Sequence, residues 1–526
     1  MKRTIAQIMT VPNAMLRNLG VLFSLLLACC GLAAAQKWSS PAIPPQFNVG
    51  IALQLTDGRI MIQEAQTSNW WALKPNEFGV YRLGTWKQLK SFPAAWGYVP
   101  TYFASAVLKD GRVIIEGGEY NNGVEDFTTL GAIYNPVTNN WVKVAPPVGW
   151  NHIGDAQSVV LPDGTFMMGN CGSPTDICTF GLQQAWLDEA TLTWTIVGSG
   201  KADGNDEEGY TLLPNGKVLT VDTYLGVPYD PNGTNSEIFD PASKTWTSAG
   251  STMQQLWDSH ALCGQTKETH EVGPAILRPN GTVFAGGADT CPSSAGHTAI
   301  YDTTSGAWSA GPDFLGSNDM ADAPAAIVPN GNVLVETNQG YGKTPTSFYE
   351  FNGTGWKNVL PPPGISGNSE GGRMLVTPTG SILLTHVDTP SMWFYTTTGT
   401  YKSAWRPHIC TAPGCFPANC VVGKTYVVKG TQFNGLTQGA AFGDDAQSAT
   451  NYPLVQITNN ATGHKFFART HNFSTMGVAT GSTATSTQFT ILPTSEGTEF
   501  GDSTMVVIAN GIPSNTVGIV VKQSGD

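Results

Sequence analysis

Short runs of apolar residues alternate with polar turns along most of the chain, and the turns recur at a regular interval. A pair of the type Asp-Gly or Asn-Gly separates two hydrophobic runs at spacings of 49 to 65 residues. Such a pair supplies the positive φ that a tight hairpin turn requires, so each pair predicts a β-hairpin at the same place in a repeat. The seven turns are Asp57-Gly58, Asp110-Gly111, Asp163-Gly164, Asn215-Gly216, Asn280-Gly281, Asn330-Gly331 and, in a degenerate form, Thr379-Gly380.

A large aromatic residue follows each of these turns by 22 to 31 positions. Four short strands in each repeat of this length, with one aromatic side chain between neighbouring sheets, are typical of a propeller blade. The sequence therefore predicts an all-β fold, with a seven-bladed β-propeller over residues 36–405 that resembles the kelch family. The aromatic residues are Trp86, Trp141, Trp194, Trp246, Trp308, Trp356 and Tyr401.

The repeat stops after Tyr401, and two further segments follow. Residues 406–420 are rich in Pro and Cys, which is typical of a linker. Residues 421–526 contain alternating β-branched stretches that are separated by Gly and Asn. We expect this last segment to form an immunoglobulin-like β-sandwich.

The first 35 residues differ from the rest of the chain. Basic residues precede an apolar run over residues 19–35, and the small residues at its end suit a signal peptidase. We therefore expect a signal peptide over residues 1–35, cleavage near Gln36, and a secreted or periplasmic protein. A lipid anchor on Cys29 is the alternative. No second apolar stretch of membrane length follows in the sequence, so we expect no transmembrane segment.

The composition limits the kinds of molecule that the chain is expected to bind. The chain has 526 residues, a net charge of −12 and only 13% charged residues, and it has no clusters of Lys or Arg. Binding to a phosphate backbone depends on such clusters, so nucleic acid is not an expected partner. We also expect a monomer.

Nine cysteines are present, of which seven remain after the predicted cleavage. An oxidising compartment allows disulfides among them, and one of the seven must stay unpaired in a monomer. Cys410, Cys415 and Cys420 lie together in the predicted linker, where zinc binding is the alternative to disulfide formation.

Three segments resemble the galactose oxidase family of secreted copper-radical oxidases. Residues 102–113, leading to residues 117–120, are similar to the segment of that family that carries its cross-linked tyrosine. Residues 442–447 and 509–514 are similar to parts of the family's terminal sandwich. The resemblance implies a kelch propeller followed by a sandwich, with Tyr102 at the cross-linked tyrosine and Tyr120 at the aromatic residue stacked over it.

The copper-binding pattern of that family is only partly present. Val49 stands where the resemblance places the linking cysteine, Glu370 where it places a tyrosine-histidine pair, and Gln447 where it places a second histidine. Tyr102 is the residue that matches a copper-ligand position. His471 would supply a histidine ligand only if the last segment were aligned differently with the family. Copper is therefore not an expected cofactor. A shared fold does not imply a shared activity.

Acidic residues gather at the positions about eight residues before each turn. In a propeller these positions line a central depression, so we expect an anionic bowl with aromatic residues at its entrance. Alternatively, single acids cap loops or accept hydrogen bonds from turn amides. The candidate ligand-binding residues are Tyr102, Tyr120, Trp150, Asp155, Glu207, His270, Glu271, Asp322, Glu370 and Gln447.

Three chemistries fit such a bowl. Carboxylates and aromatic faces together bind sugars, and glycoside cleavage needs two carboxyl groups about 5 to 9.5 Å apart. Calcium takes about six to eight oxygens.

We expect a protein that binds carbohydrate or another cell-surface ligand. The alternatives are an oxidase with rearranged ligands, a carboxylate-based glycan hydrolase or lyase, and an adhesion module without catalysis. The candidate calcium ligands are Asp155, Glu207, Asp322, Glu370 and Asp444.

Overall fold

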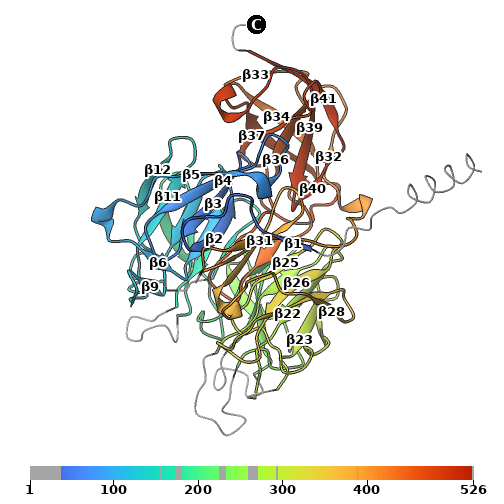
Figure 1. Ribbon diagram of the computed structural model, residues 1–526. Helices are drawn as coiled ribbons and strands as arrows, with labels where there is room; N and C mark the ends of the chain where they lie inside the picture. The colour runs from blue at the N-terminus through green and yellow to red at the C-terminus, as the bar shows by residue number, and fades with distance from the viewer. Residues whose placement is uncertain are drawn as a thin grey trace, which may run out of the picture.

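The computed structural model describes residues 37–523, except residues 155–156, 172–180, 224–232, 259–269, 292–293 and 388. The described residues form strands and turns with a few single-turn 3₁₀ helices (Figure 1). The prediction of an all-β fold is therefore confirmed. The predicted signal peptide and the candidate residue Asp155 lie outside the described residues.

Seven sheets of the described chain follow one another along the sequence. Each contains four antiparallel strands that pair in chain order. In the second sheet β9 and β10 intervene between β8 and β11, the sixth sheet gains β35 as a fifth strand, and the last sheet takes its fourth strand from the start of the described chain. The strands are β2–β5 (Val49–Gln54, Ile60–Glu64, Trp70–Lys74, Thr85–Gln88); β7, β8, β11 and β12 (Ala104–Val107, Val113–Glu116, Gly131–Asn135, Asn140–Val144); β13–β16 (Ser158–Val160, Phe166–Gly169, Gln184–Asp188, Thr193–Val197); β17–β20 (Thr211–Leu212, Val218–Val221, Ser236–Asp240, Thr245–Ser248); β21–β24 (Ala275–Leu277, Thr282–Gly286, Thr298–Asp302, Ala307–Ala310); β25–β28 (Ala325–Ile327, Val333–Thr337, Ser347–Phe351, Trp356–Val359); and β29–β31 with β1 (Gly372–Val376, Ile382–His386, Met392–Thr396, Lys37–Ser39).

The seven predicted turns each join the first two strands of one of these sheets. In the first sheet, Gly58 has a φ of 85°, and the Asp57 carboxylate accepts a hydrogen bond from the Arg59 amide at 3.1 Å. The predicted hairpins are therefore confirmed. They were predictable because the backbone and side-chain requirements of such a turn are local.

Six of the predicted aromatic residues lie in fourth strands and join neighbouring sheets. Each donates a hydrogen bond from its indole nitrogen to an earlier part of the chain, as Trp141 does to the Lys90 carbonyl at 2.7 Å and Trp308 does to Ser236 Oγ at 2.9 Å. Each indole therefore connects two adjacent units through both packing and a polar contact. The six residues are Trp86, Trp141, Trp194, Trp246, Trp308 and Trp356.

The seventh aromatic position belongs to Trp38 and not to Tyr401. Strand β1 pairs antiparallel with β31, which brings Trp38 to ring-centroid distances of 5.2 Å from Phe348 and 4.9 Å from Tyr395. The Trp38 indole nitrogen donates to the Leu360 carbonyl at 2.7 Å, as the other six do to their neighbours. The prediction of Tyr401 was wrong because the last sheet is completed by a strand from the other end of the repeats.

The strands after residue 407 form a curled sheet of nine strands at one end of the molecule (Figure 1). Their buried side chains, including Val428, Ile457 and Phe489, form a hydrophobic core cluster. Strand β35 (Ala440–Ala441) is not part of this sheet and pairs with β25. The nine strands are β32 (His408–Ile409), β33 (Asn419–Val421), β34 (Thr425–Thr431), β36 (Leu454–Asn459), β37 (Lys465–His471), β38 (Ala484–Thr490), β39 (Gly501–Ala509), β40 (Ile512–Pro513) and β41 (Val517–Lys522).

The described chain also contains a three-stranded sheet of β6, β9 and β10 and several single helical turns. No helix among the described residues has the length and apolar character needed to cross a membrane. The remaining elements are β6 (Pro100–Thr101), β9 (Tyr120–Asn121), β10 (Val124–Glu125), η1 (Tyr81–Leu83), η2 (Ala94–Trp96), η4 (Ser369–Gly371), η5 (Ser403–Trp405) and η6 (Thr494–Glu496).

Two of the three cysteines in the predicted linker form a disulfide. Cys410 is bonded to Cys415, and Cys420 is buried and unpaired. The zinc alternative for these three residues is wrong, because two of the three thiolates that it needs are already used. Cys171 and Cys291 are also disulfide-bonded.

Candidate functional site

A cavity of about 80 Å³ lies where the loops before several first strands converge. Acidic residues reach it from the loops that precede β17, β21, β25 and β29, so four different sheets each contribute a carboxyl group. The lining residues are Tyr102, Glu119, Tyr120, Glu207, Glu271, Asp322, Tyr341, Glu370, Phe442, Asp444 and Asp445.

Three of these residues have a left-handed backbone. The φ angles are 52° at Tyr102, 59° at Glu207 and 43° at Asp322. A left-handed conformation costs a residue with a Cβ about 1–3 kcal/mol, and such residues concentrate at functional sites. The same unfavourable conformation recurs in three separate loops, each just before a first strand. These three loops are therefore held in an unfavourable backbone conformation where they meet the cavity.

Glu207, Glu271 and Asp322 form the centre of the site. One carboxylate oxygen from each residue lies within 4.8 Å of those of the other two. Glu271 is 6% exposed, and its Oε2 atom has no hydrogen-bond partner among the described residues. Burial raises the pKa of Asp322 to about 8, and burial together with the charge of Asp322 raises the pKa of Glu271 well above its usual range. Three negative charges cannot stay this close without protons or a cation.

Tyr102 belongs to a second group of contacts at the edge of the same cavity. Its hydroxyl donates to Glu370 Oε1 at 2.9 Å, and Asn368 Nδ2 donates to Glu370 Oε2 at 3.2 Å. Burial, and after it the charge of Glu370, raises the pKa of Tyr102 above its ordinary value. The phenol is therefore protonated and acts as a donor to the Glu370 carboxylate.

Arg373 is the basic residue beside this group. Its guanidinium carbon lies 3.6 Å from the ring centroid of Phe442 and 5.5 Å from that of Tyr102. One of its nitrogens is 3.8 Å from Asp445 Oδ2. A single guanidinium opposes a much larger set of carboxyl groups, so the cavity is anionic when those groups are ionised.

A loop that follows β35 completes the cavity. It contributes Phe442, Asp444 and Asp445, and two glycines let it approach so closely. A Cβ on Gly443 would lie 2.7 Å from the Val272 carbonyl oxygen, and one on Gly209 would lie 2.3 Å from the Gly443 carbonyl oxygen. Larger residues at these positions would push this loop out of the site.

Six of the ten candidate ligand-binding residues line this cavity, and they are Tyr102, Tyr120, Glu207, Glu271, Asp322 and Glu370. The candidate calcium ligand Asp444 also lines it. Tyr120 is partly exposed at the edge, with its ring centroid 6.1 Å from that of Tyr102. Burial, and after it the charge of Glu119, raises the pKa of Tyr120 to about 12.

The structure places three other candidates elsewhere. Trp150 is buried in a hydrophobic cluster between sheets, and its indole nitrogen donates to Gln183 Oε1 at 2.9 Å. His270 stacks on Trp257 with ring centroids 5.0 Å apart. Gln447 is buried and donates to the Asp444 carbonyl at 3.1 Å, so it supports the loop without lining the cavity.

Sequence reasoning missed several lining residues. Glu119 and Phe442 lie inside segments that carried the family resemblance, and Glu119 directly precedes Tyr120. Asp445 follows Asp444, which was considered as a calcium ligand. Tyr341 lies in a loop after β26, and nothing in its sequence surroundings indicates a site.

Comparisons with known proteins leave the function open. No family model matches the chain, and no curated protein matches it. One similar solved structure is described as "Novel fungal alcohol oxidase with catalytic diversity among the AA5 family, in complex with copper". It has 11% identity and a TM-score of 0.48, and covers 93% of this chain and 100% of that chain. Another is "Structure of YjhT", with 16% identity, a TM-score of 0.39, and coverage of 61% and 99%. Neither similarity supports an argument about the function of this chain.

Proposed function

We propose that the seven sheets are the blades of a kelch-type propeller over residues 36–405, related to galactose oxidase. Residues 406–420 link this propeller to an immunoglobulin-like sandwich over residues 421–526. The proposal is supported by the six indoles that connect successive sheets and by Trp38, which closes the series through β1. In this arrangement the cavity lies at one end of the propeller axis.

We infer that the protein binds calcium at this axial cavity. The observation that carries the inference is the set of Glu207, Glu271 and Asp322 oxygens within 4.8 Å of one another, with Glu271 Oε2 buried and without a hydrogen-bond partner in the described chain. Two oxygens bound to one calcium ion at about 2.3–2.6 Å lie at most about 5.2 Å apart. A cation would also relieve the repulsion among the carboxylates.

Copper fits these residues poorly. A copper centre favours imidazole and thiolate ligands, whereas the described lining of the cavity contains carboxylates, tyrosines and one phenylalanine. The hydroxyl of Tyr102, the residue that matched the copper family, donates a hydrogen bond to Glu370. The donor set favours a hard cation with oxygen ligands, so no oxidase chemistry is derived for this site.

The second part of the proposal is that a carbohydrate binds through this cation. A volume of about 80 Å³ is well below the roughly 300–1,000 Å³ of typical small-molecule pockets, but it has room for an ion and one or two waters. A sugar would therefore stay at the mouth of the cavity and offer hydroxyl oxygens to the cation. Tyr120, which is partly exposed there, would face the ring.

Calcium and glycan binding by variants test this function. We expect Glu271→Gln to bind one calcium ion fewer than the wild type in calorimetry, and Glu336→Gln, which alters a buried carboxyl outside the cavity lining, to bind as many as the wild type. Glycan-array binding should disappear with a chelator, in Glu271→Gln and in Tyr120→Ala. Unchanged calcium binding in Glu271→Gln would refute the cation site, and chelator-resistant glycan binding would refute its role in recognition.

A further inference from the structure

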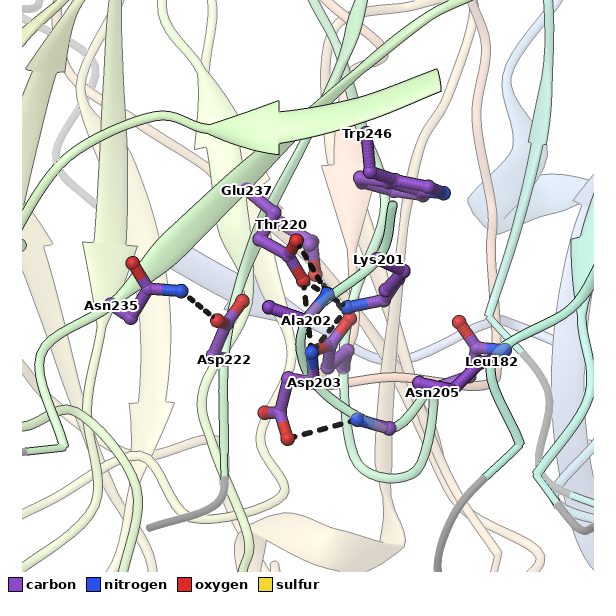
Figure 2. Close-up of polar contacts among 12 residues, drawn as sticks. Leu182, Lys201, Ala202, Asp203, Asn205, Thr220, Asp222, Asn235, Glu237 and Trp246 are labelled. Carbon is purple, nitrogen blue, oxygen red and sulfur yellow. Dashed lines mark hydrogen bonds and ion pairs between the residues drawn. The ribbon is translucent and has the colours of Figure 1, made fainter. Parts of the chain in front are cut away.

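A second group of carboxyl groups lies in the interior, beside the sheet formed by β17–β20 (Figure 2). The exposed fractions are 1% for Asp203, 0% for Glu208, 4% for Asp222 and 1% for Glu237. Glu208 directly follows Glu207 of the axial cavity, so one short segment supplies carboxyl groups to both places. None of these four residues lines the axial cavity.

One lysine is buried among these acids. Lys201 Nζ lies 2.9 Å from Glu208 Oε1 and 2.8 Å from Glu237 Oε2, and it is 5.1 Å from the ring centroid of Trp246. These contacts fix the ammonium group between two of the four carboxylates. Four carboxylates and one ammonium carry three uncompensated negative charges when all are ionised, and burial without compensation is strongly unfavourable.

Most of the carboxylate oxygens accept hydrogen bonds. Thr223 N donates to Asp203 Oδ2 at 2.8 Å, Thr220 Oγ1 donates to Glu208 Oε2 at 3.0 Å, and Ala202 N donates to Glu237 Oε1 at 2.9 Å. These contacts hold the acids in fixed positions. A site whose oxygens are already oriented loses little conformational freedom when a cation binds.

Asp222 is the exception. Asn235 Nδ2 donates to its Oδ2 atom, but its Oδ1 atom is buried and has no hydrogen-bond partner among the described residues. Figure 2 shows Asp222 between Asn235 and the Lys201 group, with one carboxylate oxygen turned away from Asn235. A buried carboxylate oxygen without a partner indicates a missing proton donor or cation.

The distances suit a cation. One oxygen each from Asp203, Glu208 and Asp222 lies within 4.8 Å of the others, as in the axial group. One carboxylate oxygen from each of the three residues is therefore close enough for one ion, and carboxylate oxygens are ligands that calcium takes. Magnesium keeps several of its waters, and these fully buried residues leave them little room.

We propose that Asp203, Glu208 and Asp222 form a second calcium site, separate from the axial site. Lys201 holds Glu208 and Glu237 in place. The ion neutralises the negative charges that the Lys201 ammonium group does not compensate. The segment from Lys201 to Tyr210 thus supplies Glu208 to this site and Glu207 to the axial cavity.

Calcium counts in four proteins test this site independently of the axial one. The proteins are the wild type, Asp222→Asn, Glu271→Gln and the double variant, each dialysed against about 1 mM calcium, within the affinity range of extracellular calcium modules. We expect two ions in the wild type, one in Asp222→Asn, one in Glu271→Gln and none in the double variant. Asn at position 222 keeps the shape of the side chain and an acceptor for Asn235. Asp188→Asn, which changes an exposed acid, should keep both ions.

If the number of bound calcium ions falls only in Glu271→Gln, the second site is refuted. Asp222 would then carry a proton in place of a bound cation. A count that falls only in Asp222→Asn would retain the second site and refute the axial proposal instead. The two failures are therefore distinguishable.

Terbium luminescence gives a readout that does not depend on the stability of Asp222→Asn. Trp246 lies beside the second group, whereas the aromatic residues that line the axial cavity are three tyrosines and a phenylalanine. Excitation of tryptophan should therefore sensitise terbium at the second site, and Trp246→Phe should reduce the part of the signal that comes from this site while calcium still competes for binding. A signal that Trp246→Phe does not reduce would contradict the proposed position of the ion.

Discussion

Glu336 in β26 is a buried acid that lies outside the cavity lining. Its side chain is 0% exposed, Thr346 Oγ1 donates to its Oε1 atom at 2.9 Å, and its Oε2 atom has no hydrogen-bond partner in the described chain. Burial raises the pKa of Glu336 from 4.5 to about 8. Between pH 4.5 and about 8, the Glu336 carboxyl group is protonated in the folded state and ionised in the unfolded state. The stability contributed by this group is therefore complete below pH 4.5 and falls as the pH rises towards 8.

We expect Glu336→Gln to remove this part of the pH dependence. The free energy of unfolding of the wild type should decrease with rising pH by up to about 1.4 kcal/mol per unit from this group, and the variant should lack that slope because an amide does not ionise. Urea unfolding at a series of pH values from 4.5 to 8 measures the difference. Glu125→Gln, at an exposed position, should keep the wild-type slope. Identical slopes for Glu336→Gln and wild type would contradict the buried, protonated state.

The residues of the site were predictable to different degrees. Glu207 and Asp322 could be found because a local turn fixes their distance from a strand, and the strand leads to the cavity. Trp150 and Gln447 could not be excluded, because their partners, Gln183 and the Asp444 carbonyl, come together only in the folded molecule. Tyr341 could not be found, since its loop reaches the cavity through packing that no local pattern records.

Strand β1 is the element that closes the series of sheets. It contains only three residues, yet Trp38 contacts Phe348 and Tyr395 and donates to the Leu360 carbonyl. We expect Trp38→Ala to lower the free energy of unfolding by roughly 2–3 kcal/mol, somewhat less than for a fully buried tryptophan. Lys37→Ala, at an exposed position of the same strand, should have little effect. Denaturant midpoints measure both. A cost for Trp38→Ala no larger than that for Lys37→Ala would show that the closure does not stabilise the fold.

The elements also differ in how far the sequence reveals them. The hairpins were predictable because glycines such as Gly58 and Gly281, both at a φ of 85°, meet a local backbone requirement. The β1 strand was not, because it pairs with β31 across the whole series and carries no turn signal of its own. The strand β35 was missed for the same reason, since two residues that pair with β25 leave no periodic pattern.

The molecule as a whole shares one core between its first sheets and its last segment. Leu53 and Met61 of the first sheet belong to the same hydrophobic cluster as Tyr452 and Phe467 of the last segment. The Tyr452 hydroxyl also donates to the Gln54 carbonyl at 2.5 Å. We therefore expect these two parts to unfold together.

Two glycines in equivalent turns test this coupling. A Cβ on Gly58 would lie 2.2 Å from Phe467 Cδ2, whereas a Cβ on Gly281 would have Thr303 Oγ1 as its nearest neighbour at 3.6 Å. Both alanine variants carry the same backbone cost at a φ of 85°, but only Gly58→Ala disturbs the shared core. Gly58→Ala should therefore cost about 1–3 kcal/mol more than Gly281→Ala in chemical unfolding. Equal costs would mean that the last segment contributes no packing there.

The loop that carries Phe442, Asp444 and Asp445 has a consequence for biosynthesis. These side chains are made after all seven sheets, and the cavity that they line is incomplete until they arrive. A ribosome-bound chain that has not reached Phe442 can form its hairpins but cannot offer the finished set of acids. Capture of the axial ligand would thus distinguish completed molecules from unfinished ones.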